Sequence, residues 1–402
     1  MCIRDRCEHV PMGPLDGVKV VDFSVMISGP LAAMMLADQG AEVVKVETPG
    51  FGDIMRLLGT NKNGMTGIFA NNNRGKRSVV VDLKNDAGRE VIHKLVEDAD
   101  VVIQNFRPGA MDRLGLGYDD LASINPDLVY TSISGYGPTG PYSGRRVYDN
   151  VIQAASGLAS GQTDPATGEP ALFRTLVCDK STAYTAAQAI TAALYARATG
   201  RSEGQHIELA MIDTAIAFLW PDSAMDAALL DDDVNRQPTL ASNYAVTRLA
   251  DGFASAGAVS DAEFAGLCAA YGRPEMAEDP RFVDTLSRMA NANEMVVELA
   301  EAAALCSLDD FVVRSEEHDV PASKINTLND LPSDPQVVNN EVFVEREHPI
   351  AGRIREPRPA ARMHGTPQRV GRVAPTHGEH TLEVIAELGL DAEALRAAGA
   401  IS

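Results

Sequence analysis

The stretch that decides the fold is Val18-Lys-Val-Val-Asp-Phe23, which is followed by Glu42-Val-Val-Lys-Val-Glu47. Both are short runs dominated by valine, a composition typical of buried strands. Between them, Pro30 begins a predicted helix that continues to Leu36, and Gly40 is a suitable residue to end it. A strand, a helix and a second strand in this order predict a βαβ unit with parallel strands.

The same alternation of strand and helix continues through the first half of the chain. It predicts an α/β domain with a mostly parallel sheet, and we describe its layout as Rossmann-like. The further predicted strands cover residues 78–82, 101–105, 128–133 and 205–209, and the further predicted helices cover 86–97, 179–198 and 211–230.

A change of composition divides the 402 residues, a length that favours more than one core. Asp231-Asp-Asp233 and Pro238 indicate a linker, and a less regular segment rich in Ala and Met follows it. Residues 1–11 lack the apolar stretch of a signal peptide and resemble translated sequencing-adapter DNA, so we expect a native start at Met12. We therefore predict a non-native extension over 1–11, a large Rossmann-like domain over 12–230, a linker and a smaller α+β domain over 231–345, and a return to the large domain over 346–402.

Composition excludes several classes of protein. The net charge of −21 repels nucleic acid and anionic lipid, so we expect neither as a partner. The chain contains no run of eighteen apolar residues, so no membrane span is expected. The five cysteines are spaced singly and indicate a reducing cytoplasm, and the eight histidines lack zinc-ligand spacing, so no metal is expected.

The sequence supports neither a dinucleotide-binding glycine motif nor a serine-hydrolase motif. Gly135-Tyr-Gly-Pro-Thr-Gly140 matches the dinucleotide pattern, but Pro138 and Pro141 prevent the helix that this pattern requires. We interpret the segment as a loop. The serine-hydrolase pattern does not occur around Ser134 or Ser156.

Two basic segments are candidate phosphate sites. Asn73-Arg-Gly-Lys-Arg77 places three cations within four residues, which is either a solvated turn or a phosphate site on an otherwise acidic protein. Asn105-Phe-Arg-Pro-Gly109 follows a predicted strand at its carboxyl end, where open α/β sheets bind ligands. There Arg107 can reach a phosphate and Phe106 can pack on a base.

Asp179 begins the long predicted helix within Leu176-Val-Cys-Asp-Lys-Ser-Thr182. An aspartate in this place is most simply an N-cap that binds free backbone N–H groups. A carboxylate at a helix N-terminus is also kept ionised by the helix dipole, which suits a nucleophile. The residues alone leave both interpretations open.

Many segments from Gly13 to the C-terminus resemble the class III CoA-transferases, a family that includes formyl-CoA and carnitine-CoA transferases and is related to the α-methylacyl-CoA racemases. The resemblance implies an interlocked homodimer in which two chains thread through each other as rings. It also implies that Asp179 is a covalent nucleophile that forms an aspartyl anhydride and then an aspartyl-CoA thioester. The similar segments are 13–22, 40–47, 73–77, 105–109, 135–142, 148–157, 200–205 and 378–381, together with Asp179.

The resemblance implies substrates and binding residues as well. The substrates are an acyl-CoA donor and a carboxylic acid acceptor, with the coenzyme A thioester as co-substrate and no tightly bound cofactor. The CoA-binding residues that it implies are Asn73, Arg74, Lys76, Arg77, Asn105, Phe106, Arg107 and Arg113, and the residues near the reacting groups are Met26, Ile27, Tyr148 and Asp149.

Departures from the family pattern bear on the reaction. The histidine that shuttles the α-proton in the racemases is matched by Tyr148, and a neutral tyrosine is a poor base near pH 7. A glutamine of formyl-CoA transferase is matched by Ile27, and the glycine-rich loop of that enzyme has no counterpart around Asp251-Gly-Phe253. Oxalate and formate are therefore not expected as substrates, and Met26 with Ile27 favours a larger or more apolar carboxylate.

Three functions remain open from the sequence. The leading hypothesis is a cytoplasmic CoA-transferase. The alternatives are an acyl-CoA racemase or epimerase, and a protein that binds CoA ligands without turnover. The sequence does not identify the donor and acceptor acids.

Overall fold

The computed structural model describes residues 13–402 apart from 165–166, 238, 240, 242–243 and 369. The predicted extension over 1–11 lies outside these residues. The chain forms two compact units. The first comprises the described residues up to Ala224 together with Glu341–Ser402, and the second comprises Met225–Asn340.

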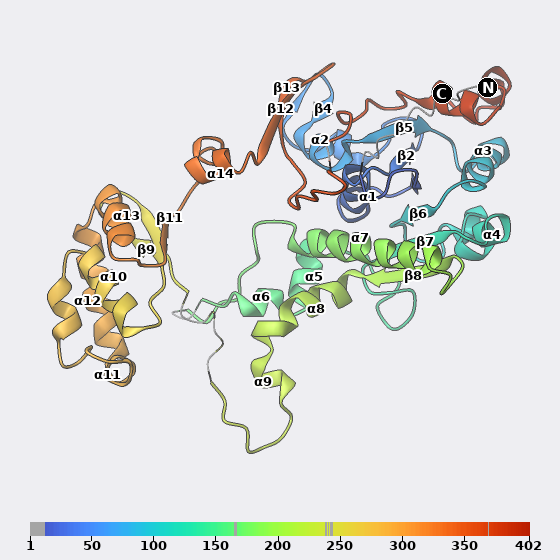
Figure 1. Ribbon diagram of the computed structural model, residues 1–402. Coiled ribbons are helices and arrows are strands. Elements are labelled where there is room, and N and C mark those ends of the chain that lie inside the picture. Colours follow the sequence, from blue (N-terminus) through green and yellow to red (C-terminus); the bar gives the residue numbers. More distant parts are fainter. Residues whose placement is uncertain (1–12, 165–166, 238, 240, 242–243, 369) are drawn as a thin grey trace, which may run out of the picture. The chain divides into compact units, whose positions relative to one another are not determined.

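The first unit contains a central six-stranded sheet in which every pair of neighbouring strands is parallel (Figure 1). The strand order is β5-β2-β1-β6-β7-β8, which is 3-2-1-4-5-6 when these strands are counted along the chain. The order reverses between β1 and β6, and ligands of such sheets bind beyond the carboxyl ends of the strands at this point. The strands are β1 (Lys19–Asp22), β2 (Glu42–Glu47), β5 (Lys76–Val80), β6 (Val101–Gln104), β7 (Val129–Ser134) and β8 (Gln205–Ala210).

Helices cover both faces of this sheet because its strands are apolar on both sides. Val20 faces the core beneath α1 and α7, whereas the next residue, Val21, faces the core beneath α3, α4 and α15. The helices of the first face are α1 (Ser28–Asp38), α5 (Asp149–Ala155), α6 (Leu158–Gly161), α7 (Val177–Ala198) and α8 (Met211–Ser223), and those of the second face are α3 (Asp86–Val96), α4 (Tyr118–Ile124) and α15 (Thr381–Glu387).

The C-terminal residues return to the sheet of the first unit. The backbone N–H of Val80 in β5 donates to Thr381 Oγ1 at 3.0 Å, and Ser78 O accepts the N–H of His380. The remaining elements of this unit are β3 (Asn61–Lys62), β4 (Met65–Thr66), α2 (Gly67–Asn73), β12 (Phe343–His348), β13 (Gly352–Pro357) and α16 (Ala392–Ala397).

The second unit has its own core beside a three-stranded antiparallel sheet of order β11-β10-β9. Tyr271 and Phe311 stack at 5.2 Å within this core. The elements are α9 (Met225–Ala228), β9 (Thr247–Arg248), β10 (Phe253–Ala256), α10 (Asp261–Ala270), α11 (Thr285–Ala290), α12 (Ala292–Leu305), α13 (Leu308–Glu317), β11 (Ala322–Lys324) and α14 (Pro335–Asn339).

Several predicted element boundaries were wrong. The predicted strand 78–82 begins at Lys76, so Lys76 and Arg77 lie in β5 and not in a turn before it. The helix predicted over 211–230 ends at Ser223, because Pro221 lies in its last turn and cannot continue the hydrogen-bond ladder. The helix predicted from Pro30 begins at Ser28. In the part of the chain that the structure describes, no helix has the length and apolar character needed to cross a membrane.

Candidate active site

Asp179 lies in the first turn of α7, as its third residue. Leu176 is the N-cap of this helix, so the simpler interpretation of Asp179 as an N-cap was wrong. The side chain is 9% exposed, which places the carboxylate at the margin of the interior and not in open solvent. Its role is therefore not explained by helix capping.

A second buried carboxylate, that of Asp149, lies beside Asp179. Asp149 begins α5 and is 3% exposed, and its Oδ2 accepts the backbone N–H of Asp179 at 2.9 Å. Gln153 Nε2 donates to Asp149 Oδ1 at 2.6 Å, and the Gln153 side chain also bonds the backbone of Phe173 and Thr175. These contacts fix the first turn of α5 against the first turn of α7.

Ser28, the first residue of α1, approaches Asp179 from the other side. Its backbone N–H and its hydroxyl both donate to the Asp179 carboxylate. Burial and the neighbouring Asp149 carboxylate raise the pKa of Asp179 to about 6, although the Ser28 hydrogen bonds lower it. The carboxylate is therefore ionised at pH 7 and more basic than an exposed aspartate, which improves it as a nucleophile.

The turn between β1 and α1 carries two predicted site residues. Met26 has a φ of 68°, which is rare for a residue with a side chain and is found at functional sites. Ile27 is 4% exposed and packs in an apolar cluster with Met55, Met65 and Phe69. The structure thus brings the turn to Asp179 through Ser28, while Asp149 contacts Asp179 directly.

A basic pocket of about 210 Å³ opens beyond the carboxyl ends of β6 and β7. Its lining includes Arg107, Arg145 and Arg146 but no acidic residue, on a chain of net charge −21. Among the described residues, the side chains of Arg107 and Arg146 form no ion pair or hydrogen bond, so their donors are available to an anion. Tyr148 also lines the pocket, and Asp149 follows it directly, so the pocket extends to the N-terminus of α5.

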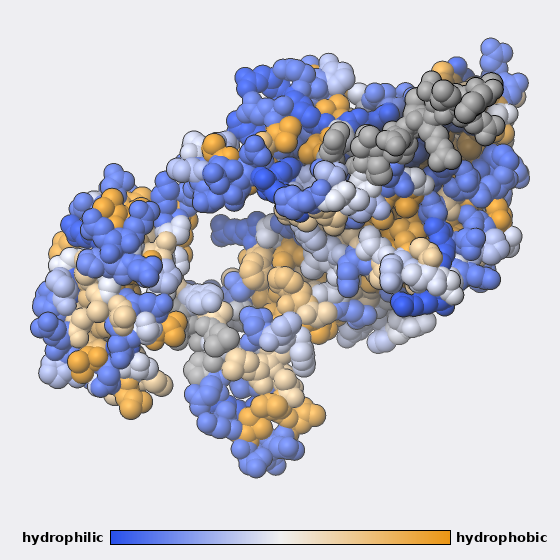
Figure 2. Space-filling model, in the orientation of Figure 1, coloured by the Kyte–Doolittle hydropathy of each residue, from blue (hydrophilic) through white to orange (hydrophobic). Residues whose placement is uncertain are grey.

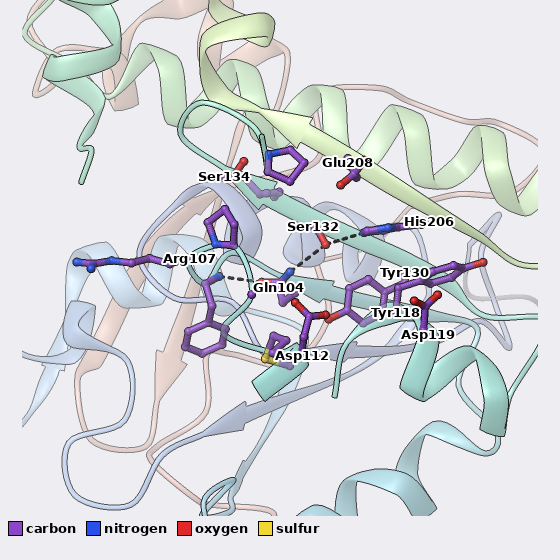
Figure 3. Close-up of a pocket in the computed structure, with 16 residues that line it drawn as sticks. Gln104, Arg107, Asp112, Tyr118, Asp119, Tyr130, Ser132, Ser134, His206 and Glu208 are labelled. Carbon is purple, nitrogen blue, oxygen red and sulfur yellow. Dashed lines mark hydrogen bonds between the residues drawn. The ribbon is translucent and has the colours of Figure 1, made fainter. Parts of the chain in front are cut away.

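A second pocket, of about 270 Å³, shares the Phe106–Pro108 loop with the first. In it, Ser132 Oγ accepts from Gln104 at 2.9 Å and lies 2.8 Å from His206 Nε2, and the Arg107 side chain points away from this group (Figure 3). Carboxylates in the lining repel phosphate, so this pocket is unsuited to the phosphates of a nucleotide. Its acidic lining residues are Asp112, Asp119 and Glu208.

Comparison with known proteins identifies the family. The model of CoA-transferase family III matches residues 15–381. The chain belongs to this family.

Named relatives of this CoA-transferase are similar over nearly the whole chain. It is 35% identical to a succinate–glutarate CoA-transferase of Agrobacterium fabrum over 93% of this chain and 96% of that protein. It is 33% identical to the succinyl-CoA:glutarate CoA-transferase of Homo sapiens over 93% of this chain and 86% of that protein. A crystal structure of a CAIB/BAIF family protein from Brucella suis has a TM-score of 0.83 and 32% identity, with 94% of this chain and 99% of that chain covered.

Some CoA-binding residues predicted for the transferase are occupied by partners within the chain. Arg74 forms a bidentate ion pair with Asp38, and the side chains of both are almost fully buried. Lys76 is fully buried and donates to Asp22, Pro30 and Asn73, and Asn73 is also fully buried. That these residues bind CoA stays a prediction, and their contacts give it no support.

The other predicted CoA-binding residues divide into two groups. Arg77 forms ion pairs with Glu383 and Glu387 of α15, and Arg113 is exposed and lines neither pocket. Phe106 and Arg107 line both pockets, and Asn105 lines the basic one. The structure therefore brings together the part of the predicted CoA site that follows β6.

Sequence reasoning missed four residues of the candidate site. Arg145 and Arg146 carried a visible signal, since two adjacent cations stand just before Tyr148 in an acidic protein. The contact of Ser28 with Asp179, and those of Gln153 with Phe173 and Thr175, carried no signal, because they join segments that are separated in sequence. In the part of the chain that the structure describes, no three His, Cys, Asp or Glu residues are placed to hold a metal ion.

Proposed function

We propose that this CoA-transferase acts by covalent catalysis through Asp179. A carboxylate oxygen of Asp179 attacks the thioester carbonyl, the C–S bond breaks, and CoA leaves as the thiolate. The thiolate then attacks the aspartyl carbonyl of the anhydride and releases the donor acid, which gives aspartyl-CoA. The acceptor carboxylate repeats these two steps in reverse order, so the acceptor thioester is released and the Asp179 carboxylate is regenerated without net proton transfer.

The observation that supports this proposal most is the environment of Asp179. Its carboxylate lies at the N-terminal turn of α7, receives two hydrogen bonds from Ser28, and is nearly buried. A nucleophile in this setting keeps the reactive ionised form at neutral pH while water has little access to the intermediates. The same N–H and hydroxyl donors are placed to stabilise oxyanions that form at the aspartyl carbonyl.

The basic pocket supports a position for CoA. We propose that Arg107, Arg145 and Arg146 bind its phosphates, while the pantetheine arm passes Tyr148 to reach Asp179. A thiolate that remains attached to a docked nucleotide is held for the return attack, which raises its effective concentration.

Racemisation is the weaker candidate. It requires a base next to the α-carbon, and Tyr148 offers a phenol that is 68% exposed. Deuterium exchange at the α-carbon of an acyl-CoA in the absence of an acceptor acid would favour racemisation over transfer.

The apolar cluster beside the turn bears on the substrate. Ile27, Met55, Met65 and Phe69 form it, and Met26 packs against it. We propose an acyl group with an apolar portion on this side. Because two relatives are named for succinate and glutarate transfer, a screen of acyl-CoA donors against acids should include dicarboxylates as well as apolar monocarboxylates.

Trapping tests the covalent mechanism. Hydroxylamine added with an acyl-CoA donor should convert an acylated Asp179 to the hydroxamate, which peptide mass spectrometry locates. Asp213 is a matched control, since it is also the third residue of its helix but is exposed. Asp213→Asn should retain activity and labelling at Asp179, whereas Asp179→Asn should lose both. An active Asp179→Asn variant would refute the mechanism.

We propose further that the enzyme is a cytoplasmic, interlocked homodimer whose large unit is Rossmann-like. Large hydrophobic side chains on α8 are exposed in the single chain, with Phe218 at 58% and Trp220 at 49%. Figure 2 shows hydrophobic side chains on the surface over α8. Exposed aromatic residues of this size indicate a surface that a partner covers.

A further inference from the structure

The turn that joins β1 to α1 is held by buried side chains. Ser24 donates its backbone N–H and its hydroxyl to Asp22 Oδ1, and the Ser24 carbonyl accepts from Lys45 Nζ at 2.7 Å. A Cβ atom on Gly29 would lie 2.2 Å from Ser24 Cβ, so only glycine allows α1 to pack this closely on the turn. The start of α1 therefore follows the position of the turn.

The next two residues of the turn are held in the same way. Asn105 Oδ1 accepts the N–H of Val25 at 2.9 Å, and Asn105 Nδ2 donates to the Val25 carbonyl at 2.7 Å. Asp53 Oδ1 accepts the N–H of Met26 at 3.2 Å. The polar backbone groups from the Ser24 N–H to the Met26 N–H are thus all bonded to side chains.

Met26 is the point of strain in this turn. Its φ of 68° is unfavourable for a residue with a Cβ, and such a conformation persists only where the surroundings impose it. Ser28 lies two residues later and donates to the Asp179 carboxylate. A relaxation of Met26 to negative φ would redirect the chain just before the residue that contacts the nucleophile.

Asp53 is well placed to impose the conformation. It is fully buried, its Oδ2 lies 3.0 Å from Lys45 Nζ, and its backbone N–H donates to Glu47 Oε2 at 3.0 Å. The oxygen that binds Met26 also accepts the N–H of Met55 at 3.0 Å. These contacts fix the Asp53 side chain against the end of β2, so it forms a rigid acceptor for the Met26 N–H.

We infer that Asp53 is a positioning residue of the transfer reaction, which it supports by holding Met26 in the left-handed conformation that directs the Ser28 donors at Asp179. This inference rests on the proposed nucleophilic role of Asp179. Asp53 does not touch the reacting atoms, and it acts through the backbone of the turn.

The experiment compares loss of this contact with loss of a similar buried contact elsewhere. Asp53→Ala removes the acceptor. The matched control is Asp38→Ala, since Asp38 is a buried aspartate paired with Arg74 at the far end of α1. Both variants should lose thermal stability. Asp53→Ala should lower kcat about 30-fold or more with little change in KM, whereas Asp38→Ala should leave kcat within about threefold of the wild type.

A double variant tests the mechanism of positioning. Glycine adopts a φ of 68° without strain, so Met26→Gly should lessen the need for Asp53. The loss of kcat caused by Asp53→Ala should therefore be at least about tenfold smaller when it is introduced into Met26→Gly than when it is introduced into the wild type. Equal kcat losses for Asp53→Ala and Asp38→Ala, or no recovery in the double variant, would overturn the inference.

A conservative variant keeps the test valid if Asp53→Ala does not fold. Asp53→Asn retains an oxygen that can accept from Met26, so its kcat should stay within about threefold of the wild type. A kcat loss above about 30-fold that Met26→Gly does not relieve would contradict the positioning role. Hydroxamate formation at Asp179 in the wild type separates the two proposals: without it the proposed function fails, and with it only the role of Asp53 is at issue.

Discussion

At the scale of single residues, the pKa of Asp179 predicts the pH dependence of the reaction. Burial and the Asp149 carboxylate raise this pKa to about 6, so the nucleophile is protonated below that pH and ionised above it. Single-turnover acylation should therefore rise with pH to a plateau, with its midpoint near 6. Ser28→Ala removes a hydrogen bond to the ionised form, so the midpoint should move to higher pH. A midpoint near 4 in the wild type would contradict this account.

The same pKa predicts that the ionised carboxylate of Asp179 lowers the stability of the folded protein. Its pKa of about 6 in the folded protein lies above the ordinary aspartate value of 3.8, so the cost is absent below pH 3.8 and complete above pH 6, where it reaches at most about 3 kcal/mol. Asp179→Asn should therefore raise the free energy of unfolding at pH 7.5 by about 1–3 kcal/mol while abolishing transfer, and the gain should disappear near pH 4. Asp213→Asn should show no such gain in denaturant titrations.

The basic pocket gives a prediction about CoA recognition. Arg146→Gln should raise KM for an acyl-CoA about tenfold with little change in kcat, since a charge-assisted hydrogen bond to phosphate is lost. An acyl-pantetheine lacks these phosphates, so its KM should not respond to the substitution. Arg353→Gln is the control, because Arg353 is exposed on β13 and pairs with Glu345. If Arg146→Gln raised KM equally for the acyl-CoA and for the acyl-pantetheine, the phosphates of CoA would have to bind elsewhere.

At the scale of secondary-structure elements, Gln153 couples α5 to the segment that leads into α7. It binds Asp149 as well as the backbone of Phe173 and Thr175, and it is 2% exposed. Gln153→Ala leaves buried polar groups unpaired, so it should lower the free energy of unfolding by about 2–3 kcal/mol and also lower kcat. Gln188→Ala, on the exposed face of α7, should change neither quantity. Denaturant titration and steady-state kinetics measure the two effects.

The elements also show what the sequence could predict. Valine-rich strands such as Glu42–Glu47 were predicted to the residue, because a strand buried on both faces leaves a continuous apolar run. Asp179 was identified as the nucleophile candidate through the resemblance to the class III CoA-transferases, since its place in the chain left an N-cap open as well. The surroundings of Asp179 were not predictable, since Ser28 and Gln153 act across long sequence separations. Lys76 shows another limit of the sequence, because the charge that suggested a ligand is buried in an ion pair with Asp22, so CoA binding by Lys76 stays a prediction without support from its contacts.

At the scale of the whole molecule, the distribution of charge separates two pockets that share one loop. The chain carries a net charge of −21, and free arginine side chains gather in the pocket beside Tyr148, while carboxylates line the other. An anionic substrate is thus repelled by much of the surface and attracted by the arginine side chains of the basic pocket. This contrast, more than pocket size, is the reason why we propose the basic pocket as the CoA site.

The final prediction concerns assembly. Phe218 and Trp220 on α8 are exposed in the single chain, so light scattering should give twice the chain mass of 42.8 kDa. Phe218→Glu with Trp220→Glu should weaken the dimer, whereas Leu382→Glu on α15 should not. Two rings threaded through each other cannot separate while both stay folded, so differently tagged subunits should exchange no faster than the protein unfolds. A monomer in solution would refute the dimer, and rapid exchange between folded dimers would refute the threading while leaving the dimer intact.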